Sequence, residues 1–353
     1  MPFDADVHAP QGDTWLAARL AVELAITKEQ ANAALEKAKE LADRGRPLGV
    51  GEIVIRMKWA TPSEVRWIND PNHPPADLLP DIRLLKLLGS GGMSRVYAAT
   101  DLRTGRSVAV KLMNASMRRS ATLMERYRAE VEVSCSVVHE NLVETYYDFE
   151  FDGLHYLVME RLDGESTRSR IDAGGCFNEV EVLEMALSTA RALKALSDAG
   201  WVHRDVKPSN IIKLKSGRYK LVDLGLAVRV GAGEGDVTAG TVSYLAPEQA
   251  EGTHLDSRAD MYALGATMYQ WLFGKLPFDV TTSDDEQLAA RIAHDLRSGD
   301  LKAAAVSHQM DFLVRKMMAR NRDMRFATWN DLIARIEGML PPSTSRRPTT
   351  RRG

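Results

Sequence analysis

The sequence has few cysteines, little net charge and no long apolar run. Cys135 and Cys176 are the only cysteines among 353 residues, too few for a disulfide framework, so a reducing compartment such as the cytoplasm is expected. The formal net charge of −2 gives no electrostatic reason to expect binding to nucleic acid or to a membrane surface. No apolar run is long enough to span a bilayer, and residues 1–10 lack the apolar core of a signal peptide.

The composition is that of a folded protein with more than one domain. Hydrophobic residues make up 44% and charged residues 27% of the chain, as in ordinary globular proteins. Three prolines between residues 71 and 75 disfavour helix and predict an extended linker. We expect these segments in order: a disordered start at 1–13, a helical domain at 14–70, the linker at 71–80, a large domain at 81–340 and a basic disordered tail at 341–353.

Two helix starts with the same pattern mark the N-terminal segment. Thr27 is followed three residues later by Gln30, and Thr61 is followed in the same way by Glu64. A threonine with Gln or Glu at this spacing predicts a capping box, in which each residue's side chain accepts a bond from the other's backbone. Pro62 suits the first turn of the second of these helices.

The stretches from Ile26 to Gln30 and from Arg46 to Gly49 resemble the helical N-terminal domain of type II secretion ATPases. The resemblance covers some forty residues, and a second Arg-x-Leu-Gly is absent. It implies a helical bundle that docks a partner or forms a homodimer, with binding of a cyclic dinucleotide as the alternative.

One short loop concentrates residues suited to phosphoryl transfer. Asp205 can accept a proton from an attacking hydroxyl, Lys207 can neutralise charge on a transferred phosphoryl group, and Asn210 can hold a divalent metal. On this stretch alone, the alternative is a basic surface loop.

Further motifs precede and follow the loop. A strand runs into a glycine-rich turn that starts at Gly89 and back into a strand, which lets backbone N–H groups approach phosphate oxygens. The apolar strand Val108–Lys111 carries one lysine, which needs a partner unless it faces solvent. Asp223 ends a later strand and is expected to face the metal-binding residue of the loop.

Taken in order, these motifs resemble the eukaryotic-type (Hanks-type) protein kinases, and among them the bacterial serine/threonine kinases, from residue 82 to about residue 340. The resemblance implies an α+β, bilobal fold with a small β-rich lobe, a larger helical lobe and ATP between them. Asn210 and Asp223 are expected to hold Mg²⁺, with Mn²⁺ as a substitute. Lys111 is expected to anchor the phosphates and to pair with a glutamate on the next helix, for which Glu130 is preferred to Glu125 and Glu132. The residues expected to contact ATP are Gly89, Ser90, Gly91, Gly92, Val96, Ala109, Lys111, Met159, Glu160 and Leu162.

The same resemblance assigns roles in an activation segment from Asp223 to Glu248. Thr238 is expected to be phosphorylated and to pair with Arg204, and Ser243 is the second candidate phosphosite. The residues expected to support the site are His203, Arg204, Thr241, Glu248, Asp260 and Arg325, with Asp260 bracing the loop and Arg325 pairing with Glu248.

The function implied is ATP-dependent phosphorylation of serine and threonine hydroxyls on proteins, including autophosphorylation. The alternative is a pseudokinase scaffold that binds ATP and partners without efficient phosphoryl transfer. It rests on Ser94 in place of the third glycine of the turn and on Leu224 in place of the family's phenylalanine.

Overall fold

The computed structural model describes residues 12–23, 26–70, 74, 78–91, 94–113, 120–151, 154–231, 241–252, 255–278, 296 and 306–341. The chain forms two compact units, each built from two stretches of sequence. Unit 1 comprises Met1–Val131 and Thr145–Arg161, and unit 2 comprises Glu132–Glu144 and Leu162–Gly353. Within the described ranges, no helix has the length and apolar character needed to cross a membrane.

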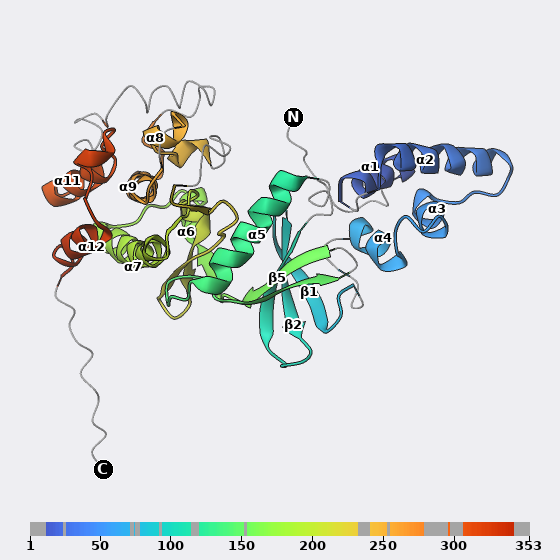
Figure 1. Cartoon of the computed structure of the whole chain (residues 1–353), viewed down its shortest axis with the longest axis horizontal. Coiled ribbons are helices and arrows are strands. Elements are labelled where there is room, and N and C mark those ends of the chain that lie inside the picture. Colours follow the sequence, from blue (N-terminus) through green and yellow to red (C-terminus); the bar gives the residue numbers. More distant parts are fainter. Residues whose placement is uncertain are drawn as a thin grey trace, which may run out of the picture. The chain divides into compact units, whose positions relative to one another are not determined.

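Unit 1 begins with four helices (Figure 1, blue). They are α1 (Asp13–Glu23), α2 (Lys28–Asp43), α3 (Val50–Arg56) and α4 (Pro62–Asn69). Both predicted capping boxes are confirmed. Thr27 and Gln30 exchange bonds of 2.7 and 3.1 Å at the start of α2, and Thr61 and Glu64 exchange bonds of 2.7 and 3.2 Å at the start of α4.

Helix α3 is capped from a distance. Its N-cap residue, Gly49, has no side chain to accept a bond, and the Asp13 Oδ1 atom of α1 accepts the Val50 N–H instead, at 2.9 Å. Gly51 also lies close to its neighbours, because a Cβ atom there would sit 2.9 Å from the Cγ1 atom of Val65 on α4. These contacts join α1, α3 and α4 into one bundle.

The rest of unit 1 is a five-stranded antiparallel sheet with the order β1-β2-β3-β5-β4. Val96 lies opposite Lys111, and Ala109 lies opposite Met159. Because side chains alternate along a strand, these four residues share one face of the sheet. The strands are β1 (Ile82–Ser90), β2 (Ser94–Asp101), β3 (Ser107–Met113), β4 (Thr145–Phe151) and β5 (Leu154–Glu160).

Both faces of this sheet are covered. On the face that carries Lys111, helix α5 (Ala121–Ser136) packs Tyr127 against Met113 and Leu157. On the opposite face, Tyr97 and Val110 join one continuous apolar core with side chains of α1–α4. An antiparallel strand with one solvated face alternates in burial, whereas β3 is buried at nearly every position.

Unit 2 is mainly helical and has two small sheets, with the orders β6-β8-β9 and β10-β7. Helix α9 is buried along its length from Ala259 to Trp271, as its uniformly apolar sequence predicts, and it packs against α7 and α11 (Figure 1). The helices are α6 (Thr167–Asp172), α7 (Glu179–Asp198), α8 (Pro247–Ala250), α9 (Arg258–Phe273), α11 (His308–Met317) and α12 (Trp329–Glu337). The strands are β6 (Gly164–Ser166), β7 (Trp201–Val202), β8 (Ile211–Leu214), β9 (Tyr219–Leu221) and β10 (Val228–Arg229).

The predicted fold class is confirmed. Unit 1 contains the five-stranded sheet, preceded within the unit by the helices α1–α4, and unit 2 is mainly helical. Neither Cys135 nor Cys176 forms a disulfide. The expected domain boundaries stay a prediction, and the expected disordered segments fall almost wholly outside the described residues.

Candidate active site

The loop predicted to carry the chemistry lies in unit 2 between β7 and β8. Asp205 is buried there, and three polar atoms surround its carboxylate. The Lys207 Nζ atom is 2.7 Å from Asp205 Oδ2, and the Asn210 amide nitrogen donates to the same oxygen at 2.9 Å. The same amide nitrogen also donates to the backbone carbonyl of Asp205 at 2.9 Å. The structure therefore brings the three predicted residues of this loop together.

Thr241 completes this cluster from the far end of the activation segment. Its hydroxyl donates to Asp205 Oδ1 at 3.0 Å and accepts from Lys207 Nζ at 2.7 Å. One hydroxyl thus bonds to both the Asp205 carboxylate and the Lys207 ammonium group.

Asp260, at the start of α9, braces the backbone of the loop. Its carboxylate accepts the N–H groups of His203 and Arg204 at 2.8 and 2.9 Å. Burial raises the pKa of the Asp260 carboxyl above its ordinary value. Arg204 adopts a left-handed conformation with φ of 69°, which is unfavourable for a residue with a Cβ atom and persists only where surrounding contacts hold it.

A second support of the loop was not predicted. The Thr167 hydroxyl of α6 donates to the Pro208 carbonyl at 2.8 Å and accepts from the Trp271 indole N–H at 2.9 Å. All of these groups are buried. The sequence signal was only the position of Trp271 within an apolar helix, which predicts burial but not a bond to a residue far away in sequence.

The second predicted metal ligand, Asp223, follows directly after Val222, whose N–H donates to the Asn210 carbonyl at 2.9 Å. This bond between backbones brings the two predicted ligands into neighbouring positions. Asp223 is exposed and has a φ of 66°, so its backbone is strained like that of Arg204. Leu224 is buried, and its apolar side chain fills a core position.

The end of the activation segment is anchored to the helical core of unit 2. The Tyr244 hydroxyl donates to the side-chain oxygen of Gln270 on α9, and burial raises the pKa of Tyr244 to about 12. Arg325 is fully buried and forms two bonds to the Glu248 carboxylate, of 2.5 and 2.7 Å. Ser243 is half-buried in a short 3₁₀ turn, and Thr238 lies outside the described residues.

In unit 1, Lys111 on β3 pairs with Glu130 on α5. The Lys111 Nζ atom is 2.6 Å from Glu130 Oε1, with side-chain exposures of 11% and 6%. The two alternatives behave differently: Glu125 is exposed, and Glu132 pairs with Arg229 at the surface of unit 2. Of the three glutamates, Glu130 is thus the one that the structure places against the strand lysine.

The remaining predicted nucleotide-binding residues lie at two ends of the sheet. Gly89 and Ser90 end β1, and the Gly91 N–H donates to the Ser94 carbonyl at 2.9 Å to close the turn. Gly92 lies outside the described residues. Met159 and Glu160 end β5, and Leu162 is the first residue of unit 2 after it.

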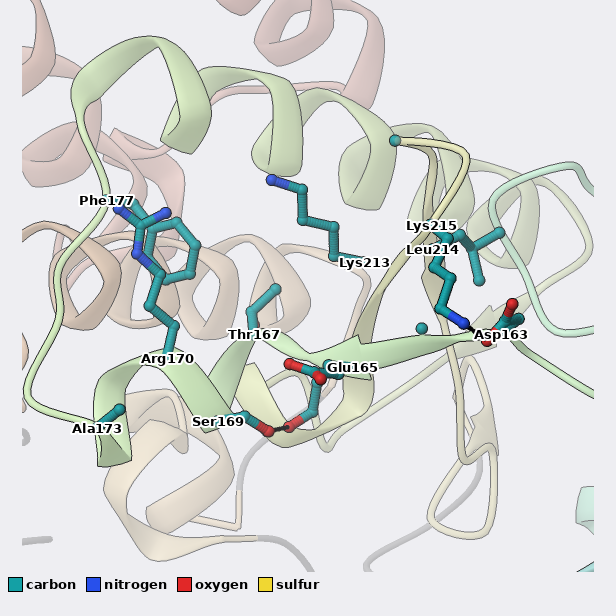
Figure 2. A pocket seen from close by; sticks show the side chains of 13 residues that line it. Asp163, Glu165, Thr167, Ser169, Arg170, Ala173, Phe177, Lys213, Leu214 and Lys215 are labelled. Carbon is teal, nitrogen blue, oxygen red and sulfur yellow. Dashed lines mark hydrogen bonds and ion pairs between the residues drawn. The ribbon is translucent and has the colours of Figure 1, made fainter.

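Unit 2 also contains a groove of about 730 Å³. Figure 2 shows Arg170 stacked on Phe177 at one end and Lys215 paired with Asp163 at the other. Arg170 also pairs with Glu181 at 2.8 Å. No residue predicted for the active site lines this groove.

Comparisons with known proteins agree with the geometry. Residues 82–336 match the protein kinase domain family. A serine/threonine-protein kinase PknB of Mycolicibacterium smegmatis is 34% identical over 283 residues, which cover 76% of this chain and 45% of that protein. The PknB of Mycobacterium tuberculosis is 32% identical over 286 residues, with coverage of 77% and 45%.

A probable serine/threonine-protein kinase PknB of Corynebacterium glutamicum is 39% identical over 202 residues, which cover 55% of this chain and 31% of that protein. The chain thus spans less than half the length of these curated relatives. The family match itself covers most of the chain. On this match, the chain belongs to the protein kinase domain family.

Proposed function

We propose that this chain transfers the γ-phosphoryl group of ATP to serine and threonine hydroxyls of proteins, including its own. The observation that carries the proposal is the cluster in which Thr241 connects Asp205 and Lys207. It places a carboxylate base beside a cation that can stabilise the transferring phosphoryl group. The names of the relatives, serine/threonine-protein kinases, support the same choice of hydroxyl.

In this mechanism Asp205 orients the attacking hydroxyl and accepts its proton. Asn210 and Lys207 hold the carboxylate in place, so little reorganisation is needed when the proton moves. Lys207 then offsets the negative charge that develops on the transferred group. Lys111, held by Glu130, binds the α- and β-phosphates of ATP.

Asn210 and Asp223 are the residues proposed to hold the metal. The amide nitrogen of Asn210 is occupied by Asp205, so its side-chain oxygen is the atom that remains for a ligand. Oxygen donors of this kind beside phosphates suit Mg²⁺, with Mn²⁺ as a substitute. A bound divalent ion would neutralise the phosphate charges, and the residues named above perform the other steps.

Further parts of the proposal concern regulation and location. Thr238 is proposed as the main autophosphorylation site and Ser243 as the second, with phosphothreonine pairing with Arg204 to order the segment. The N-terminal helices are proposed to dock a partner or a second copy of the chain, or to bind a cyclic dinucleotide. A cytoplasmic location is proposed from the low cysteine content.

The test is autophosphorylation with Mg-ATP, comparing the wild-type chain with Asp205→Asn. Loss of a general base lowers the rate by about 10²–10⁴-fold, so label on serine and threonine should all but vanish in the variant. Asp198→Asn is the matched control, because Asp198 pairs with Lys194 at the surface of the same unit. Unlabelled wild-type protein that still binds ATP would instead support the pseudokinase, and mass spectrometry of labelled protein tests Thr238.

A further inference from the structure

A buried tryptophan of helix α4 contacts the sheet of unit 1. Trp67 is fully buried, and its indole N–H donates to the Tyr97 hydroxyl of β2 at 2.7 Å. The guanidinium of Arg95, also on β2, lies 5.1 Å from the centre of the Trp67 ring. Trp67 precedes the range 82–336 that matches the kinase family, so nothing in the family match assigns it a role.

The two β2 residues that contact Trp67 flank Val96, a predicted ATP contact. Arg95 and Tyr97 face the helices, whereas Val96 faces the opposite side of the sheet, because successive side chains of a strand alternate. Val96 lies directly opposite Lys111 in the register of β2 and β3. Trp67 thus contacts one face of this segment of β2. The opposite face of the same segment carries Val96, a predicted nucleotide contact.

Within the first hairpin of the sheet, β1 is paired less regularly with β2 than β3 is. Strand β1 is an edge strand with two register shifts, one between Leu84 and Lys86 and one between Leu87 and Gly89. Leu85 and Leu88 of β1 are exposed. An irregular edge strand supports its neighbour less than a regular one does, so the contacts behind β2 add to its pairing with β3 in fixing its position.

Trp67 lies on α4, and several contacts hold α4 within the bundle of N-terminal helices. Asp13 caps α3, Gly51 allows close packing against α4, and the apolar core runs without a break from α1–α4 into the sheet. A displacement of β2 would break a buried hydrogen bond and open this core.

We propose that Trp67 is a positioning residue for nucleotide binding, which fixes β2 through Tyr97 and Arg95 so that Val96 and Lys111 are preorganised for ATP. The four N-terminal helices then act as the back wall of the nucleotide-binding sheet. This inference rests on the proposed function, since it concerns the same ATP.

The test compares Trp67→Phe and Tyr97→Phe in the full chain, each of which removes the hydrogen bond and keeps an aromatic ring. The affinity for Mg-ADP should fall by about threefold to tenfold in each, as expected for one buried hydrogen bond. The KM for ATP should rise by the same factor, with kcat nearly unchanged. The loss in the double variant should be smaller than the two single losses combined, because both changes remove the same hydrogen bond.

Trp59→Phe is the matched control. Trp59 belongs to the same helical segment and packs against the same core, but the described contacts include no hydrogen bond from it to the sheet. Its affinity for Mg-ADP should equal that of the wild type. A purely structural role for Trp67 would lower the melting temperature of Trp67→Phe and leave its nucleotide affinity unchanged, which would overturn the proposal.

Hydrogen exchange gives a second readout, and its first comparison needs only the wild-type chain. Coupling between two sites is reciprocal, so saturating Mg-ADP should slow amide exchange in α4, and Trp67→Phe should abolish this effect. Unchanged exchange in α4 would contradict the proposal even if Trp67→Phe failed to fold. Wild-type protein that binds no nucleotide would refute the proposed function itself, and the inference with it, whereas normal wild-type binding with unaffected variants would refute the inference alone.

Discussion

In unit 2, the carboxylate of Asp205 is surrounded by Lys207, Asn210 and Thr241, each within 3.0 Å. In unit 1, Lys111 has an ionic partner in Glu130, and its position otherwise follows from strand register and from an apolar core on the far face of the sheet. Polar contacts therefore fix the site residues of unit 2, whereas packing fixes much of the geometry in unit 1.

This difference predicts how unit 1 and unit 2 respond to amino-acid substitutions. The geometry of a polar cluster depends on individual atoms. A buried polar group that loses its partner costs more free energy than the hydrogen bond itself contributes. The geometry of a packed sheet depends on the volume of its buried side chains and on the register of its strands. Residues that are distant from the catalytic residues and outside the family match can therefore change this geometry. The following predictions test this contrast, from the largest expected effect to the smallest.

The largest effect is expected in the scaffold of unit 2. Glu248→Gln leaves Arg325 buried without its counter-charge, and breaking such a pair costs about 3–5 kcal/mol of the free energy of unfolding. Glu337→Gln is the control, because Glu337 pairs with Arg191 at the surface, where the cost is below about 1 kcal/mol. Urea unfolding measures both, and equal losses would show that burial does not decide the strength of these pairs.

The next effect concerns the charged pair of Lys111 and Glu130 in unit 1. Glu130→Gln removes the charge that holds Lys111 against the phosphates, and a displacement of the lysine lowers kcat/KM by about 10²-fold. Glu132→Gln, two residues along α5, loses only a half-exposed partner and should retain nearly full activity. Initial rates of phosphate transfer from ATP distinguish the two, and similar rates would show that the pair is not needed.

A smaller effect is expected from the single hydroxyl in the unit 2 cluster. Thr241→Val keeps the shape of the side chain and removes the bonds to Asp205 and Lys207. A hydrogen bond to a charged group is worth about 1.5–3 kcal/mol, so the rate should fall at least about tenfold. Thr241→Ser keeps the hydroxyl and should restore most of the rate. If serine proved as poor as valine, the methyl group rather than the bonds would matter.

The smallest effect is a change in pH dependence. Burial alone would raise the pKa of the Asp256 carboxyl, but bonds from Arg258 outweigh it, so the pKa lies below its ordinary value. Its contribution to stability is present above the unfolded-state pKa of about 3.9 and is lost as pH falls through the lower folded-state pKa.

We therefore expect Asp256→Asn to be less stable than the wild type by about 1 kcal/mol at pH 7. The difference should stay constant down to about pH 5 and shrink below about pH 4. Urea unfolding across this range measures it, with Asp172→Asn as an exposed control that pairs with Arg168. A difference that grows on acidification would have the wrong sign and exclude this explanation.

Much of the site was predictable because its residues are close in sequence. Asp205, Lys207 and Asn210 lie within one loop, so their meeting follows from a short stretch of backbone. The capping boxes of α2 and α4 are local in the same way. The pairing of Lys111 with Glu130 spans two elements, and the family resemblance supplied it.

Contacts between distant residues without a motif were not predictable. The bond from Trp67 to Tyr97, the cap that Asp13 provides for α3 and the support of Pro208 by Thr167 each join separate elements. Each of these side chains is common in ordinary surface or core positions. Nothing in the local pattern tells which of many partners they meet.

The family, the order of the elements and the residues proposed for catalysis follow from the amino-acid sequence, because they depend on local patterns and on motifs in a given order. Only the tertiary structure decided that α1–α4 cover the back of the sheet and that Tyr97 meets Trp67. The physical reason is that burial of an apolar face is non-directional: a sequence shows that such a face must be covered, but not by which segment.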